Sequence, residues 1–315
     1  MEELLKVEEL KKYFPREKKV LKAVDDVSFS IKAGETLGLV GESGSGKSTL
    51  GRSLLRLIEP TAGRVFFKGY DLKKLKSEEL RKLRKKMQII FQDPLASLNP
   101  QMNIGQIIED PLIVHGIFSE AERKEKVFEM LDIVGLGRRF FGAFPFEFSG
   151  GQQQRVGIAR ALVLNPEFVV CDEPVSALDV SIQAQIISLL AELREKLGLS
   201  YLFISHDLAV VKFISDRVAV IYLGRLVEIG KKTEIFSSPL HPYTKALISS
   251  VPKIPKDGKP IKRYETLKGE IPSPIDLPSG CRFRSRCPIA IDKCSMEEPQ
   301  LKDYGSGHMA SCWRI

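Results

Sequence analysis

The sequence predicts an α/β protein built on a largely parallel sheet that helices cover. Short, continuously apolar runs alternate with helical patterns, as buried parallel strands do. A glycine-rich loop joins one of these runs to a helix, at the kind of sheet edge where α/β proteins bind ligands. After about residue 235 the composition shifts to Pro, Ser, Lys and Gly, which predicts an extended tail lying over the body.

Composition supports a folded globular chain. The 315 residues are 43% hydrophobic and 28% charged, which excludes intrinsic disorder as the main state. No apolar run approaches the roughly 18 residues that span a bilayer. The segment Met1–Lys6 is charged and carries no export signal, so a cytoplasmic location is expected. The net charge of +8 permits nucleotide or anionic-membrane binding but requires neither.

The periodicity of apolar residues predicts the elements in order. Helices are expected from about Gly46 to Leu57, across most of 100–145, and from Val180 to Lys196. Strands are expected within 20–35 and at Thr36–Val40, Met87–Phe91, Glu167–Cys171, Tyr201–Ser205 and Val218–Leu223.

The strongest motif is the loop between the Thr36–Val40 strand and the following helix. It matches GxxxxGK[ST], a P-loop whose backbone N–H groups cradle phosphates. Lys47 is expected to reach the β- and γ-phosphates and the Ser48 hydroxyl to bind Mg²⁺. The predicted phosphate-binding residues are Gly41, Glu42, Ser43, Gly44, Ser45, Gly46, Lys47, Ser48 and Thr49.

A second motif places two carboxylates at the end of an apolar strand. Asp172 is expected to hold Mg²⁺ through water, and Glu173 to polarise the attacking water or act as general base. Taken alone, an Asp-Glu pair after a strand can also be a simple turn.

A third motif, Phe148-Ser149-Gly150-Gly151-Gln152, reads either as a helix start capped by Ser149 or as an anion nest before a helix. With the first two motifs it makes the chain resemble the ATP-binding cassette (ABC) ATPases, whose signature is LSGGQ. Phe148 replaces the Leu of that signature, and Gln153 stands where the family has a basic residue.

The resemblance implies further site residues. Gln92 resembles the glutamine that senses Mg²⁺, Ser176–Asp179 the D-loop, and His206 the switch histidine on the γ-phosphate. Phe14 occupies the place of the aromatic residue that stacks on adenine, with Tyr13 as the neighbouring alternative. The implied catalytic set is Glu173, His206, Gln92 and Lys47, and the implied Mg²⁺ set is Ser48, Gln92 and Asp172.

The resemblance also implies a domain plan. It gives a RecA-like P-loop NTPase core with an N-terminal antiparallel β part at 1–94 and 165–235, and an inserted α-helical signature subdomain at 95–164. Residues 236–315 form a C-terminal extension whose segments HPYT, GEIPSP and PSGCRFRSRCP are similar to the extension of dipeptide and oligopeptide importer ATPases. The segments FQDPLASLNP and CDEPVSALDVSIQAQI resemble the F type of that family.

The family forms its sites between two ATPase subunits, so the implied partners are a second, D-type ATPase subunit, two membrane permease subunits and an extracytoplasmic solute-binding protein. No nucleic-acid partner is expected. The implied function is ATP hydrolysis that powers solute import at the cytoplasmic face of the membrane. The alternative is a non-transport ABC ATPase of DNA repair or translation. The solute cannot be read from the sequence.

Four cysteines in the extension predict a metal site: Cys281, Cys287, Cys294 and Cys312. Their spacing leaves a [4Fe-4S] cluster, a zinc site and free thiols open, although zinc ligands are more often paired closely. Resemblance to importer subunits favours the [4Fe-4S] cluster. Cys171 lies in a buried strand and is expected to be a core residue.

Overall fold

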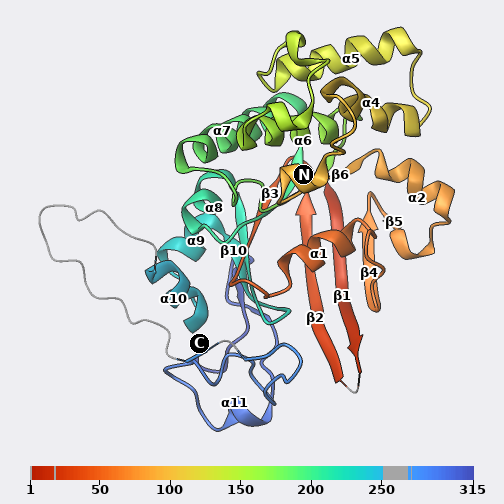
Figure 1. Ribbon diagram of the computed structural model, residues 1–315. Coiled ribbons are helices and arrows are strands. Elements are labelled where there is room, and N and C mark those ends of the chain that lie inside the picture. The colour runs from red at the N-terminus through yellow and green to blue at the C-terminus, as the bar shows by residue number, and fades with distance from the viewer. Residues whose placement is uncertain (1, 18, 251–268, 271) are drawn as a thin grey trace, which may run out of the picture. The chain divides into compact units, whose positions relative to one another are not determined.

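The computed structural model describes residues 2–17, 19–250, 269–270 and 272–315 (Figure 1). The chain divides into two compact units. The first comprises Met1–Leu5, Ile31–Thr36 and Phe66–Ser205, and the second comprises Lys6–Ser30, Leu37–Val65 and His206–Ile315. Part of the predicted extension, 251–268 and 271, lies outside the described residues.

The first unit contains three parallel strands in the order β6, β7, β8. They are β6 (Met87–Ile90), β7 (Phe168–Asp172) and β8 (Ser200–Ile204). Every residue of β7 and β8 is buried, because helices supply apolar cover, as the continuous apolar runs predicted. The helix α7 (Val180–Leu197) is tied to β8 by the Tyr201 hydroxyl, which donates to the Leu190 carbonyl at 3.1 Å.

The rest of this unit is mostly helical, as expected for 100–145. Three helices begin with capping boxes: α4 (Ile104–Val114) at Asn103, α5 (Glu120–Ile133) at Ser119 and α6 (Gly150–Leu162) at Ser149. Two shorter helices, α2 (Ser77–Arg84) and α3 (Pro94–Ser97), come before them in the chain.

The second unit holds most of three neighbouring strands in the order β2, β1, β4. They are β1 (Glu3–Arg16), β2 (Lys19–Lys32) and β4 (Ala62–Phe67), and the long pair β1 and β2 is red in Figure 1. In the first unit, Phe66 and Phe67 at the end of β4 pair antiparallel with β5 (Tyr70–Asp71). The apolar pattern predicted strand structure at 20–35 and gave no separate prediction of β1.

A further set of strands in the second unit carries the phosphate loop. β3 (Thr36–Val40) pairs in parallel with β9 (Arg217–Tyr222), and β9 pairs antiparallel with β10 (Arg225–Lys231). The helices of this unit are α1 (Lys47–Leu54), α8 (Leu208–Ile214), α9 (Lys232–Ser237), α10 (Pro242–Ser249) and α11 (Lys293–Met296).

The C-terminal extension contributes strands to this sheet and packs against β9 and β10. β12 (Met309–Ala310) pairs antiparallel with both β10 and β11 (Lys302–Asp303). The fully buried Glu228 of β10 accepts hydrogen bonds from the backbone N–H groups of Leu240 and His241, and lies 2.7 Å from Nε2 of His308. The expectation of an extended conformation after residue 235 is wrong at Pro242–Ser249, which forms α10, while buried polar and aromatic contacts hold the described part of the extension on β9 and β10.

Among the described residues, no helix is long and apolar enough to cross a membrane.

Candidate active site

The phosphate loop leaves β3 at Gly41 and enters α1 at Lys47. Gly44 and Gly46 have φ of +76° and +100°, in the left-handed region that favours glycine. A Cβ on Gly46 would lie 2.0 Å from the Ala23 carbonyl oxygen, and one on Gly41 would lie 2.3 Å from that of Ile221. The loop can therefore adopt this path only with glycine at positions 41 and 46.

The loop fits a phosphate group. A Cβ on Gly44 would meet nothing within 4 Å, so this side of the loop is open. The N-terminus of α1 follows directly, and its N–H groups and dipole favour an anion. The Lys47 ammonium donates to the carbonyls of Gly41 and Glu42 at 2.9 and 3.0 Å, which holds the cation within the loop. Ser48, in the first turn, offers the hydroxyl predicted for Mg²⁺.

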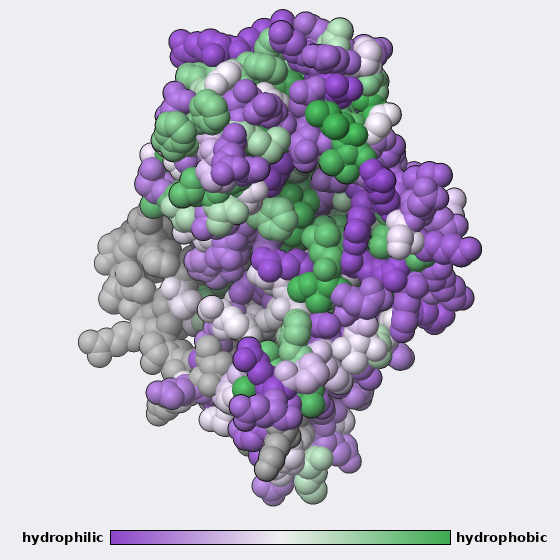
Figure 2. All heavy atoms as spheres, turned by 45° about the vertical axis from the view of Figure 1, so that its right-hand side comes forward, coloured by the Kyte–Doolittle hydropathy of each residue, from purple (hydrophilic) through white to green (hydrophobic). Residues whose placement is uncertain are grey.

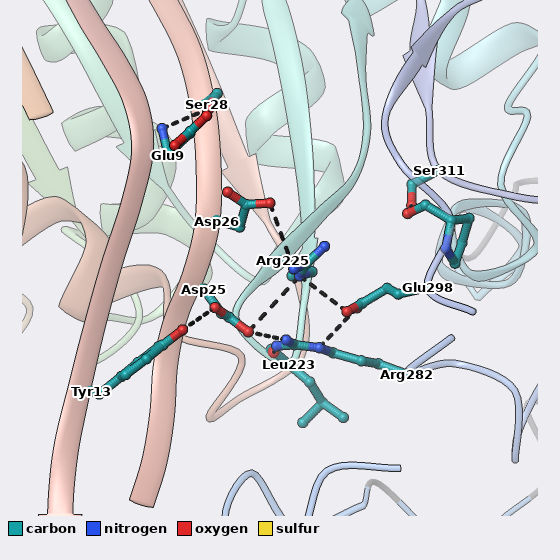
Figure 3. Close-up of polar contacts among 11 residues, drawn as sticks. Glu9, Tyr13, Asp25, Asp26, Ser28, Leu223, Arg225, Arg282, Glu298 and Ser311 are labelled. Atoms are coloured by element: carbon teal, nitrogen blue, oxygen red, sulfur yellow. Dashed lines mark hydrogen bonds and ion pairs between the residues drawn. The ribbon is translucent and has the colours of Figure 1, made fainter. Parts of the chain in front are cut away.

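The two candidate adenine-stacking residues differ in their contacts. The Tyr13 hydroxyl donates to the Asp25 carboxylate, and burial followed by this bond raises the pKa of Tyr13 (Figure 3). The Phe14 ring lies 4.7 Å from the Lys12 ammonium. Because successive residues of a strand point to opposite faces, Tyr13 and Phe14 cannot serve the same face of β1. The Lys22 ammonium lies 5.5 Å from the Tyr13 ring, so a cation is near each of the two rings.

In the first unit the structure brings Glu173 and Gln92 together. Asp172, the last residue of β7, is fully buried. Glu173 follows with φ of +46°, a conformation that a residue with a side chain rarely adopts and that is typical of functional positions. Its backbone N–H donates to the Ile204 carbonyl at 3.1 Å, and the Gln92 amide donates to its carboxylate at 3.3 Å.

The predicted signature lies at the start of α6. Ser149 caps the helix: its hydroxyl accepts from the Gln152 N–H at 3.4 Å, and the Gln152 side chain accepts from the Ser149 N–H at 3.0 Å. A Cβ on Gly151 would lie 2.4 Å from Cγ2 of Ile182 in α7, so glycine allows the two helices to approach closely. Gly150 is exposed and Phe148 is buried.

Gln153, the departure from the family pattern, is buried beside the signature and donates to the carbonyls of Pro145 and Phe148 at 2.9 and 3.2 Å. A neutral amide satisfies these two acceptors, so no basic residue is needed at this position.

Two further predicted residues are exposed. Asp179 caps α7 by accepting from the Ile182 N–H at 3.0 Å. A hydrogen bond from the Ser181 hydroxyl, with backbone bonds, lowers the pKa of Asp179. His206 follows β8 and belongs to the second unit, with the phosphate loop, whereas Gln92, Asp172, Glu173, Asp179 and the signature belong to the first.

The predicted metal site is not supported. Among the described residues, no group of three or more His, Cys, Asp or Glu side chains is placed to hold a metal ion. Backbone pairing of the Cys281 N–H with the Cys294 carbonyl, at 2.8 Å, joins two of the cysteine segments. Burial raises the pKa of Cys281 to about 11 and favours the neutral thiol there. Cys171 is fully buried in β7, as a core residue should be.

Sequence reasoning missed the residues that hold the loop from the extension. The Tyr243 hydroxyl accepts from the Glu42 N–H at 2.9 Å, and Arg286 binds the Glu42 carboxylate. These residues lie in HPYT and CRFRSRCP, segments that stood out only by resemblance, and nothing in them indicates a contact with residue 42.

Comparisons with known proteins agree with this geometry. Residues 24–176 match the family model described as "ABC transporter", and residues 227–294 match "Oligopeptide/dipeptide transporter, C-terminal region". The chain is 54% identical to the oligopeptide transport ATP-binding protein AppF of Bacillus subtilis, over 99% of this chain and 97% of that protein. It is 50% identical to the dipeptide transport ATP-binding protein DppF of Haemophilus influenzae, over 97% and 95%.

Solved structures are similar as well. The dimeric post-hydrolysis structure of the ATP-binding cassette MJ0796 bound to ADP and Pi is 33% identical, with a TM-score of 0.67 over 73% of this chain and 99% of that one. The structure of cbiO1 from Clostridium perfringens is 29% identical, with a TM-score of 0.67 over 76% and 92%.

The phosphate loop, the strand-end carboxylates and the cassette fold define a P-loop ATPase of the ATP-binding cassette class. The chain belongs to the ABC transporter ATP-binding proteins and carries the C-terminal region of their oligopeptide/dipeptide branch.

Proposed function

We propose that this chain is the ATP-hydrolysing subunit of an importer for oligopeptides or dipeptides. The observation that carries the proposal is the match of nearly the whole chain to transport ATP-binding proteins, including the extension of the peptide branch. No observation favours the alternative of a repair or translation ATPase.

Different residues bind the different parts of Mg-ATP. The loop and Lys47 bind the phosphates, and Phe14 stacks on adenine. As the family resemblance implies, Ser48, Gln92 and Asp172 would hold Mg²⁺, which would supply charge neutralisation at the phosphates.

The pair of Gln92 and Glu173 carries the hydrolytic step. The amide of Gln92 orients the Glu173 carboxylate, which is the group that would accept a hydrogen bond from the attacking water. His206 contacts the γ-phosphate. The backbone bond from the Glu173 N–H to the Ile204 carbonyl supports the left-handed conformation of Glu173.

The signature serves the ATP of a second ATPase subunit. Ser149 and Gly150 are exposed at the start of a 13-residue helix whose N-terminus favours an anion. A head-to-tail pair of ATPase subunits, with a D-type paralogue as the partner, therefore completes each site. The division into a core at 1–94 and 165–235, a signature subdomain at 95–164 and an extension at 236–315 belongs to the same proposal.

The helical part of the first unit is the surface for the permease subunits at the cytoplasmic face of the membrane. Several large apolar side chains are exposed there, namely Leu95, Ile113, Val114 and Phe118. Figure 2 shows apolar residues among mostly hydrophilic ones on the face it presents. Leu98 is only 3% exposed, so it supports the fold of this surface rather than contacting a partner. A solute-binding protein outside the cell would deliver the peptide.

The finer proposal for the extension is a [4Fe-4S] cluster on Cys281, Cys287, Cys294 and Cys312, with zinc as the alternative. The backbone bond from the Cys281 N–H to the Cys294 carbonyl, at 2.8 Å, brings two of the four cysteine segments together. Ligand binding would require their side chains to turn toward a common centre, because the described side chains do not form such a group.

Glu173→Gln tests the function. It removes the basic oxygen and keeps the shape, so ATP binding should persist while ATPase activity falls by roughly 10²- to 10⁴-fold. The two measurements are ATP affinity of the purified chain and phosphate release by the assembled transporter. Activity close to that of the wild type would contradict the role of Glu173.

A further inference from the structure

Three arginines alternate along the extension, at positions 282, 284 and 286. Arg282 and Arg286 are buried, although a guanidinium is seldom buried without a partner. Arg284 is half-buried, and its partners among the described residues lie within the extension, where it donates to Ser279 and to the Ser295 carbonyl at 3.1 Å. The two buried arginines therefore need an explanation that Arg284 does not.

Arg286 holds the first turn of the phosphate loop. Its two terminal nitrogens donate to the two oxygens of Glu42 at 2.7 and 2.9 Å, a bidentate geometry that restricts both groups. The Glu42 N–H donates to the Tyr243 hydroxyl, and the Glu42 carbonyl accepts from Lys47. Residue 42 is thus fixed at its side chain and N–H by the extension, and at its carbonyl by the phosphate-binding lysine.

Arg282 acts at the other end of the same loop. It donates to the Leu223 carbonyl in the turn between β9 and β10 and to the buried Asp25 carboxylate (Figure 3). The next residue of that turn, Gly224, donates its N–H to the Ser45 carbonyl of the loop at 2.9 Å. Its own carbonyl accepts from the Asp25 N–H at 2.8 Å. Arg282 therefore fixes the turn that holds Ser45.

An aromatic cluster keeps this part of the extension rigid. Phe283, between the two arginines, contacts Tyr222 and Tyr243 with ring centroids 5.3 and 5.4 Å apart. The Arg286 guanidinium lies 5.9 Å from the Tyr222 ring. The three rings are almost fully buried, so they hold the backbone between Arg282 and Arg286 in a fixed position.

We propose that segment 281–287 of the extension positions the phosphate loop for ATP, with Arg286 acting through Glu42 and Arg282 through the Leu223–Gly224 turn. The inference rests on the proposed ATPase function and adds positioning residues to it. The charge of Arg286 contributes to this positioning of the phosphate loop. A carboxylate at the second position of a phosphate loop repels phosphate oxygens, and Arg286 neutralises it while holding the backbone in place.

The experiment compares Arg286→Gln with Arg284→Gln in the full chain, by titration of Mg-ATP. Arg286→Gln should raise the Kd for ATP about tenfold, which corresponds to about 1.4 kcal/mol. Arg284→Gln removes the same charge from the same segment and should leave the Kd unchanged, because it does not contact the loop. An Arg286→Gln variant that binds ATP as tightly as the wild type would overturn the inference.

The double variant Arg286→Gln/Glu42→Gln separates positioning from simple support of the fold. Because it removes the uncompensated carboxylate, it should bind ATP more tightly than Arg286→Gln alone. A merely structural arginine would lower the melting temperature without ATP and gain nothing from Glu42→Gln, and that result would also overturn the inference. A wild-type chain that binds no ATP would instead overturn the proposed function.

Discussion

Asp25 should be one of the most important ionised groups for the stability of the second unit. Its side chain is only 6% exposed and accepts from the Tyr13 hydroxyl and from the Arg282 guanidinium. Asp25→Asn keeps the shape and removes the charge, so the buried Arg282 loses its central partner. Arg282 keeps Glu298 at 3.0 Å and the Leu223 carbonyl, which limits the loss.

The loss of unfolding free energy expected for Asp25→Asn follows from these contacts. Removing one partner of a buried ion pair costs about 3–5 kcal/mol, and the remaining contacts of Arg282 place Asp25→Asn at about 3 kcal/mol. Asp26→Asn is the matched control, because Asp26 is 29% exposed and lies 3.6 Å from Arg225. Because the Asp26–Arg225 pair is partly exposed, Asp26→Asn should lower the free energy of unfolding by no more than about 1 kcal/mol. Urea unfolding at pH 7 measures both free energies of unfolding.

The pH dependence gives a second check. Burial opposes ionisation of Asp25, but hydrogen bonds from Tyr13 and Arg282 outweigh it and lower the pKa of Asp25 in the folded state. As the pH falls below the ordinary value of 3.8, the unfolded chain takes up a proton before the folded one does. The stabilisation by Asp25 is therefore complete above about pH 4. It is lost as the pH falls through the folded pKa, so the difference between wild type and Asp25→Asn should shrink there. Equal free energies of unfolding for Asp25→Asn and Asp26→Asn at pH 7 would refute this reasoning.

Two further predictions concern the loop and the cysteines. Gly46→Ala should abolish tight ATP binding and destabilise the chain by more than the roughly 1–3 kcal/mol of local backbone strain, because the new Cβ meets the Ala23 carbonyl oxygen at 2.0 Å. Gly44→Ala should destabilise the chain only by that strain. Equal free energies of unfolding in urea for Gly46→Ala and Gly44→Ala would argue against the clash at Gly46. Anaerobic purification followed by iron, sulfide and zinc analysis should find a cluster that survives Cys171→Ala and is lost in Cys287→Ala. Zinc, or no metal, in the wild type would exclude iron–sulfur binding.

Local motifs determined the ATP-binding part of this protein. The glycines of a GxxxxGK[ST] loop allow the backbone path that leads into the helix N-terminus, so the motif by itself assigns a role to Gly41, Gly46 and Lys47. Continuous apolar runs likewise located β7 and β8 within one residue, because strands buried on both faces need no polar alternation. Family resemblance alone identified Gln92 as a site residue, and its hydrogen bond to Glu173 was not predicted.

The tertiary structure decided the role of the extension. Residues 42 and 286 are 244 positions apart, and a charged pair at that separation leaves no periodic signal in the sequence. The Pro- and Ser-rich composition indicated an extended tail lying over the body, whereas the described part of the extension contains a helix and a strand and packs on β9 and β10 through buried groups such as Phe283. A long-range contact exists only once both partners are placed by the rest of the fold, and for this reason the sequence alone could identify the phosphate loop but not the arginines that hold it.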